Sequence, residues 1–103
     1  MTATTIKPGD IWCSRWGIEQ TNVEFYEVTR TTKTMVTLAR IDQLDEHDGN
    51  MGGRTVPIPG KRTGDKPVRR KVKWYDGEPY AHLCDYETAR PWNGSPAYFT
   101  TYA

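Results

Sequence analysis

Hydrophobic and polar residues alternate with a period of two over several short stretches of the chain, which is the pattern of half-buried β-strands. Residues 11–16 place Ile11 and Cys13 on one face, and Trp12 and Trp16 on the other. Residues that favour turns, chiefly glycine, proline, asparagine and aspartate, interrupt the alternation between these stretches. The pattern therefore predicts short strands joined by tight turns.

Residues 22–31 are predicted to form a central strand, because they carry apolar side chains on both faces. Phe25 points to one side and Tyr26 to the other. A short turn at 32–33 separates this stretch from 34–41, which alternates in the same way. Strands so close in sequence are expected to pair as an antiparallel hairpin.

Periodicity is lost over residues 43–53, which are acidic and glycine-rich and are predicted to form a mobile loop. Residues 56–60 are an edge strand at best, because their two prolines remove hydrogen-bond donors from a ladder. Residues 61–75 are predicted to form a basic loop followed by a strand.

The C-terminal third begins with Asp76-Gly77, the strongest two-residue hairpin signal in the chain. Residues 78–83 should pair back across this turn, and residues 98–102 should form a closing strand. Residues 85–90 are the one helical candidate, because an aspartate can cap the first turn and a proline stops the helix after residue 90.

These elements predict a single mostly β domain over residues 1–103. The expected fold class is a small antiparallel barrel or rolled sheet of the SH3-like type, with one short helix near the C-terminus. Ile, Leu, Val and Phe together number only 16 in 103 residues, but the net charge is +1, and 4 Trp and 6 Tyr are present. Because each aromatic side chain can bury about 150–250 Å², we expect an aromatic-rich core.

Charge is unevenly distributed along the chain. Residues 61–73 hold seven basic side chains and one acid, which gives them a net charge of +6 and leaves −5 for the remainder. Such asymmetry favours a charged partner. No stretch approaches the roughly 18 apolar residues of a membrane span, and no apolar run follows the N-terminal Met1. A cytoplasmic protein with no membrane contact is therefore expected.

The polar run 19–22, flanked by two aromatic residues, is the first candidate site. Amide side chains offer paired donors and acceptors, and aromatic rings offer stacking faces, so the run can recognise a partner. The alternative is a turn whose polar groups bind nearby backbone while the aromatic rings pack in the core. The candidate partner-binding residues are Trp16, Glu19, Gln20, Thr21, Asn22 and Tyr26.

The basic segment is the second candidate site. Alternation would place several of its cations on one strand face, an arrangement that can bind nucleic-acid phosphates or an acidic protein surface. The alternative is a solvated edge strand whose charges prevent edge-to-edge pairing. The candidate residues are Lys61, Arg62, Arg69, Lys71, Lys73 and Tyr75.

No catalytic residue, metal or cofactor is predicted. His47, His82, Cys13 and Cys84 lack the close spacing of zinc ligands, and a cysteine–histidine pair is no better supported. The acidic residues at 45–48 are only a fragment of a calcium-loop pattern. The two cysteines are expected to be small buried or half-buried thiols.

Three stretches, at 7–12, 16–28 and 86–96, resemble a group of small proteins encoded by bacteriophages and mobile elements. That group is recognised by a Trp-Gly-Tyr-(Glu/Asp)-Gln-Thr-Asn-Val-Asp-Phe-Tyr core. This chain has Ile18 in place of the tyrosine and Glu24 in place of the second acid. The resemblance implies a phage origin and a bacterial cytoplasm, and no substrate.

A second similarity links the Gly-Asp-Ile-Trp stretch at 9–12, followed by Glu-Gln at 19–20, to toxin ribonucleases with an SH3-like barrel. Those enzymes continue with an Arg-Pro pair, whereas this chain continues with Thr-Asn-Val-Glu-Phe-Tyr.

The function expected from the sequence is that of a non-enzymatic phage accessory protein that binds a host or phage protein. The alternatives are a nucleic-acid-binding module that uses residues 61–73, and a ribonuclease-like toxin. An exposed aromatic patch would favour an interface, including that of a homo-oligomer.

Overall fold

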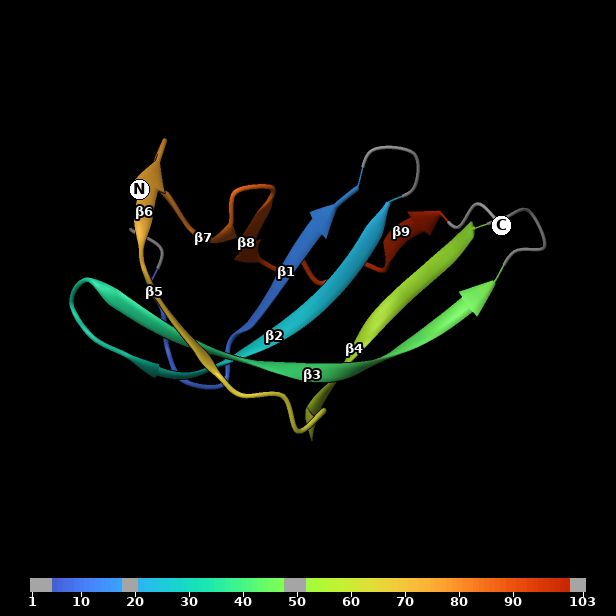
Figure 1. The fold of residues 1–103 in the computed structure, drawn as a ribbon, viewed down its shortest axis with the longest axis horizontal. Helices are drawn as coiled ribbons and strands as arrows, with labels where there is room; N and C mark the ends of the chain where they lie inside the picture. The colour runs from blue at the N-terminus through green and yellow to red at the C-terminus, as the bar shows by residue number, and fades with distance from the viewer. Residues whose placement is uncertain (1–4, 18–20, 48–51, 101–103) are drawn as a thin grey trace.

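The computed structural model describes residues 5–17, 21–47 and 52–100. Within these ranges the chain forms nine strands and no helix: β1 (Ile11–Trp16), β2 (Asn22–Thr31), β3 (Met35–His47), β4 (Gly52–Arg62), β5 (Val68–Lys71), β6 (Lys73–Tyr75), β7 (Glu78–Cys84), β8 (Glu87–Pro91) and β9 (Ala97–Thr100). The strand order is β6-β7-β8-β1-β2-β3-β4-β9, with β5 also pairing with β3, and every pair is antiparallel. The sheet curls into a half-barrel (Figure 1).

The main core lies on one face of the curled sheet, which we call the inner face. Strand alternation sends side chains from β1, β2, β3, β7 and β8 to this face. With Val72, they form a buried cluster consisting of Trp12, Tyr26, Val28, Val36, Leu38, Val72, Ala81 and Ala89. Trp12 is the largest of the fully buried side chains, which agrees with the expected aromatic contribution to the core.

A second core lies on the opposite, outer face of β2. Phe25 packs there edge-on against Trp92, with 5.8 Å between the ring centroids. Strand β9 supplies Ala97 and Phe99 to the same cluster. The backbone N–H of Thr100 donates to the carbonyl of Thr21 at 3.1 Å, which joins the end of β9 to the residue before β2. Strand β2 is therefore central and apolar on both faces, as predicted.

Several local predictions are confirmed. The predicted strands at 11–16 and 22–31 have the bounds of β1 and β2. Asp76 and Gly77 have φ angles of 52° and 80° and join Tyr75 to its partner Glu78. Two successive residues with positive φ are typical of the type I′ turn that matches the twist of a tight hairpin.

The predicted helix at 85–90 is wrong. Cys84 pairs with Glu87 across the turn formed by Asp85 and Tyr86, and the chain continues as β8 between β7 and β1. Alternation buries Glu87 and Ala89 on the inner face. A helix this short is marginal in isolation, so ladder hydrogen bonds on both sides and burial outweigh its capping signals.

The predicted loop at 43–53 is also wrong where the structure describes it. Residues 43–47 continue β3 and residues 52–53 begin β4, while 48–51 lie outside the described residues. An ideal Cβ at Gly53 would lie 2.0 Å from the Glu46 carbonyl oxygen, so glycine permits a close approach of the two strands. The His47 ring meets Phe99 edge-on at 5.3 Å. The end of β3 is a strand whose side chains are exposed and mostly polar. Its sequence therefore lacks the alternation of apolar and polar residues that marks a half-buried strand.

Strand β4 is more than the edge strand predicted at 56–60. Its first half lies between β3 and β9, and it extends to residue 62. The register with β3 shifts between Ile41 and Gln43, which pair with Arg62 and Pro57 respectively. The irregularity spans Pro59, which explains how prolines are accommodated here. The closing strand predicted at 98–102 is β9, as far as the structure describes it.

Candidate functional site

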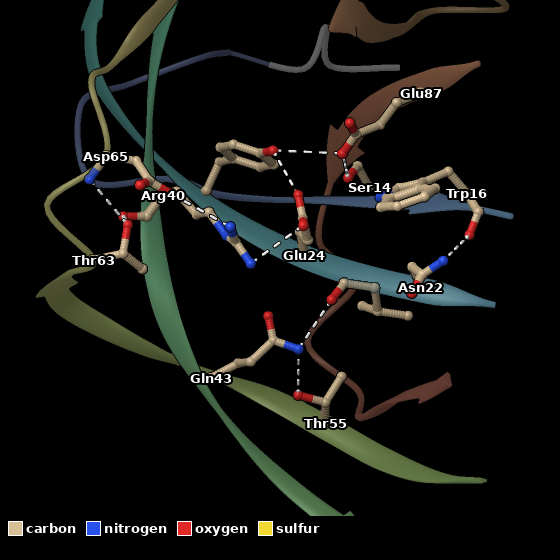
Figure 2. A network of polar contacts seen from close by, with 12 residues as sticks. Ser14, Trp16, Asn22, Glu24, Arg40, Gln43, Thr55, Thr63, Asp65 and Glu87 are labelled. Atoms are coloured by element: carbon tan, nitrogen blue, oxygen red, sulfur yellow. Dashed lines mark hydrogen bonds and ion pairs between the residues drawn. The ribbon is translucent and has the colours of Figure 1, made fainter. Parts of the chain in front are cut away.

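One end of the inner face carries a network of polar side chains (Figure 2). The Tyr26 hydroxyl donates to Glu24 Oε2 at 3.0 Å and lies 3.4 Å from Glu87 Oε2. The Ser14 hydroxyl also donates to Glu87 Oε2. These contacts connect β1, β2 and β8, so residues far apart in the sequence hold one another in place.

Arg40 extends the network to the loop that precedes β5. Its Nη2 lies 3.2 Å from Glu24 Oε1, and its Nη1 lies 3.4 Å from Asp65 Oδ2. We call the six residues Ser14, Glu24, Tyr26, Arg40, Asp65 and Glu87 the inner network. Within the described residues, Arg40 Nε is buried without a hydrogen-bond partner. The network thus ties β2 and β3 to the loop that closes this end of the half-barrel.

Burial sets the protonation behaviour of the network. Burial raises the pKa of Glu87, and the negative charge of Glu24 raises it further, while the hydrogen bonds from Ser14 and Tyr26 lower it. Burial and the two glutamates hold the pKa of Tyr26 well above its usual value. Tyr26 is therefore a neutral donor at physiological pH, and Glu87 holds its proton more tightly than an exposed glutamate does.

A cavity of about 270 Å³ adjoins the inner network. It is lined by Glu24, Tyr26, Leu38, Arg40, Asp65, Lys66, Val68, Arg70, Leu83, Cys84 and Glu87. Arg70 faces inward and donates from Nη2 to the Leu83 carbonyl at 3.2 Å. The cavity brings acidic and basic side chains together. The side chains of the inner network, however, contact one another and join strands. A buried polar network of this kind stabilises a fold.

The first predicted site does not form one surface. Trp16 is half-buried, with its ring 5.6 Å from that of Tyr86, and Asn22 Nδ2 donates to the Trp16 carbonyl at 3.3 Å. Thr21 N donates to Thr100 Oγ1 at 2.7 Å, on the side of β9. Tyr26 is only 8% exposed and belongs to the main core.

Glu19 and Gln20, the other members of this predicted site, lie outside the described residues. For the described members, the alternative of backbone hydrogen bonding and core packing fits better than recognition.

The second predicted site is divided by ion pairs and by strand pairing. Lys61 Nζ lies 3.8 Å from Asp42 Oδ2, and Arg62 Nη2 lies 3.2 Å from Glu27 Oε2. These two cations therefore have acidic partners.

The remaining members of the second site lie on two separate strands. Arg69 and Lys71 project from the outer side of β5, as the alternation predicts, and both are exposed. Lys73 and Tyr75 belong to β6, which pairs with β7 and not with β3. The change of partner at Val72 separates the two groups.

Sequence reasoning missed a residue that lies beside the β5 cations. Arg30 on β2 pairs with Thr37 on β3, which in turn pairs with Arg69 on β5, so the two arginines flank one threonine on the outer face. Lys71 pairs with Met35 in the next row. A register shift between Val28 and Arg30 sets this alignment. No sequence pattern predicts such a shift.

We call Arg30, Arg69 and Lys71 the β5 patch. All three are exposed. Among the described residues, none of them has an acidic group within ion-pairing distance. The cations of the β5 patch therefore differ from Arg40, Lys61 and Arg62, which all have acidic partners.

No group of three or more His, Cys, Asp or Glu side chains in the described part of the chain is placed to hold a metal ion. Cys13 is a half-buried free thiol, as expected, whereas Cys84 is an exposed free thiol, so the expectation of burial is wrong for Cys84. Burial raises the pKa of Cys13, which lowers its reactivity. The described residues also contain no helix long and apolar enough to cross a bilayer.

Comparisons with protein-family models, curated protein sequences and solved structures find no match to this chain.

Proposed function

We propose that this chain is a non-enzymatic accessory protein that acts by binding, and that the β5 patch docks on an acidic surface of a partner protein. The observation that carries the proposal is a group of exposed cations, Arg30 on β2 and Arg69 and Lys71 on β5, which lie on either side of β3 and have no acidic partner among the described residues. Like charges gathered on one face repel each other and lower stability. An acidic partner would relieve that repulsion and speed association.

The shape of this region also supports a protein partner. The patch spans three paired strands, β2, β3 and β5, with Thr37 and the half-buried Met35 of β3 among the cations. A methionine beside arginine and lysine combines apolar contact with charge, and both methionine and arginine are enriched at protein interfaces.

The phage origin, the cytoplasmic setting and the SH3-like type of barrel belong to the same proposal. The sequence resemblance supports the first two, and antiparallel strands curled around one main core support the third. An experimental structure in which β1–β3 superimpose on an SH3 barrel would establish the fold type.

The test is a capture experiment from host lysate with matched charge-reversal variants. Arg69→Glu with Lys71→Glu should abolish capture of the proteins that the wild type enriches. Lys7→Glu with Lys66→Glu makes the same change in net charge away from the patch and should leave capture intact. Captured proteins should be acidic and should dissociate as salt rises. Equal capture by both variants would contradict the proposal.

The two other functions raised by the sequence have direct tests. Incubation of the pure protein with RNA would reveal cleavage if the chain is a ribonuclease-like toxin, and intact RNA after long incubation removes that function. Nucleic-acid binding through residues 61–73 should weaken steeply with salt and in the Arg69→Glu, Lys71→Glu variant.

A further inference from the structure

A second cationic surface lies on the outer face of β1, β8 and β7. In one row, Arg15 pairs with Thr88, which pairs with His82. In the next row, Cys13 pairs with Arg90. The register that pairs Ala81 with Ala89 places Tyr80 beside Arg90. We call Arg15, Tyr80, His82, Thr88 and Arg90 the β8 surface.

Side-chain contacts within the β8 surface fix the relative positions of its aromatic and cationic groups. The Arg90 guanidinium carbon lies 5.8 Å from the centroid of the Tyr80 ring. That ring meets the His82 ring edge-on at 5.4 Å, and His82 Nδ1 lies 3.0 Å from Thr88 Oγ1. A guanidinium, a phenol ring and an imidazole therefore lie next to one another on an accessible sheet face.

Arg90 separates two hollows in this face. One has a volume of about 320 Å³ and is lined by Cys13, Arg15, Thr88, Arg90, Pro91, Trp92 and Asn93. The other has a volume of about 580 Å³ and is lined by Tyr75, Asp76, Glu78, Pro79, Tyr80 and Arg90. The first contains two arginines and no acid, whereas the second contains two acids beside its aromatic rings.

Two arginines on this surface can hold a single anion. Arg15 and Arg90 are diagonal neighbours on paired strands, for which the separation is about 7–8 Å. Both are exposed, and among the described residues neither has an acidic partner within ion-pairing distance. Arginine forks bind phosphate oxygens in a bidentate manner, which a single lysine cannot do.

We propose that the β8 surface binds a nucleotide unit, with the phosphate between Arg15 and Arg90 and the base stacked on the side of Tyr80. The phosphate would occupy the acid-free hollow. The base would lie toward the second hollow, where Tyr75 adds another ring and the two acids offer acceptors for base N–H groups. A cationic sheet face with accessible aromatic rings is the arrangement that binds single-stranded nucleic acid by charge and stacking.

This assignment differs from the nucleic-acid site suggested by the sequence. Lys73 is the one residue of the basic segment 61–73 that lies next to the β8 surface, because it pairs with Tyr80. Arg15 and Arg90 lie near opposite ends of the chain, and neither belongs to a basic cluster in the sequence. The β8 surface is also separate from the β5 patch, so either proposal can fail without the other.

The experiment is a fluorescence titration at low salt with a labelled oligouridylate of about twelve nucleotides, a length within the range that small sheet domains bind. Arg15→Ala with Arg90→Ala should weaken binding about tenfold or more and reduce its salt dependence, because two phosphate contacts are lost. Tyr80→Ala should weaken binding while leaving the salt dependence unchanged. The matched control, Lys7→Ala with Lys66→Ala, removes the same charge from two exposed positions outside both proposed binding surfaces and should bind as the wild type does.

Unlabelled uridine monophosphate as a competitor distinguishes a free nucleotide from a nucleic-acid strand. Displacement at comparable concentrations assigns the site to a free nucleotide, and displacement only by oligonucleotide assigns it to a strand. No binding by the wild type, or an equal loss in the control variant, would overturn the proposal. Thermal melts check folding; if the alanine variant is unfolded, Arg15→Lys with Arg90→Lys, which keeps charge but not the bidentate fork, takes its place and should also bind more weakly.

Discussion

Arg40 and Arg90 occupy the two faces of the same curled sheet and have opposite surroundings. Arg40, on the inner face, contacts the carboxylates of Glu24 and Asp65. Arg90, on the outer face, contacts the ring of Tyr80 and has no acidic partner among the described residues. The difference separates two uses of charge. The charges of the inner network hold strands together, whereas Arg90 on the outer face stays available for a ligand.

The comparison predicts that substitutions in the main core and the inner network cost stability, and that substitutions of exposed cations on the outer face do not. The largest loss should come from Trp12→Ala, because Trp12 is 1% exposed at the centre of the main core. We expect the free energy of unfolding to fall by about 3–5 kcal/mol, measured by urea denaturation. The control Trp74→Ala removes a side chain that is 51% exposed and should cost less than about 1 kcal/mol. Equal losses in the two variants would contradict the assignment of the core.

A smaller loss is expected from Arg40→Ala, because it leaves the carboxylates of Glu24 and Asp65 without their cation. Hydrogen bonds to charged groups contribute about 1.5–3 kcal/mol, and the partial exposure of Arg40 places the expected loss near the lower end of that range. The matched control is Arg30→Ala, an outer-face arginine on the adjacent strand. If the two variants are equally stable in thermal and urea unfolding, the inner network does not contribute to the fold.

Glu87 should make the free energy of unfolding depend on pH, which tests the inner face separately from the outer face. The folded protein holds the Glu87 proton more tightly than the unfolded chain does, because the pKa is raised. Its contribution to stability is therefore present below the ordinary glutamate pKa of about 4.3, and it is lost as the pH rises through the raised value. Glu87→Gln should match the wild type in acid and be more stable than the wild type at neutral pH, because glutamine carries no charge into the buried site.

The measurement for Glu87 is the free energy of unfolding as a function of pH for both proteins. Ser14 and Tyr26 can still donate to the glutamine carbonyl oxygen, so the substitution removes charge and keeps the hydrogen bonds. A variant that loses stability relative to the wild type as the pH rises would mean that the fold favours the ionised carboxylate.

The smallest effect on stability is expected on the outer face. Arg69→Ala with Lys71→Ala should change the free energy of unfolding by less than about 0.5 kcal/mol, because both side chains are exposed and neither has an acidic partner among the described residues. Relief of repulsion within the β5 patch would make the change slightly stabilising. A loss comparable to that of Arg40→Ala would show that these cations hold the fold together.

Sequence patterns predicted the local structure best where a strand buries apolar residues or a turn needs special residues. The alternation around Phe25 and Tyr26 gave the bounds of β2, and Asp76-Gly77 gave the hairpin. The helix prediction failed because Glu87 is a buried polar residue of a strand, which a capping pattern does not distinguish from a helical position. The loop prediction failed because the end of β3 is polar and exposed.

The candidate sites depended on pairing that no local pattern contains. Arg69 and Lys71 were predicted to share a face, and they do, but their neighbour Arg30 is brought close only by a shifted register. Arg15 and Arg90 become neighbours because β1 pairs with β8 across most of the chain. A single sequence offers no covariation to reveal such pairs.

The pairing of β1 with β8 also governs how the chain can fold. Residues 12–15 pair with residues 88–91, and the Ser14 hydroxyl donates to Glu87 next to this pairing. On the ribosome, the apolar face around Trp12 stays uncovered until that late segment has emerged. Closure of so long a loop is a slow, high-contact-order event. We therefore expect β1 and β8 to pair late in folding, and we expect the nascent chain to be most prone to aggregation just before they pair.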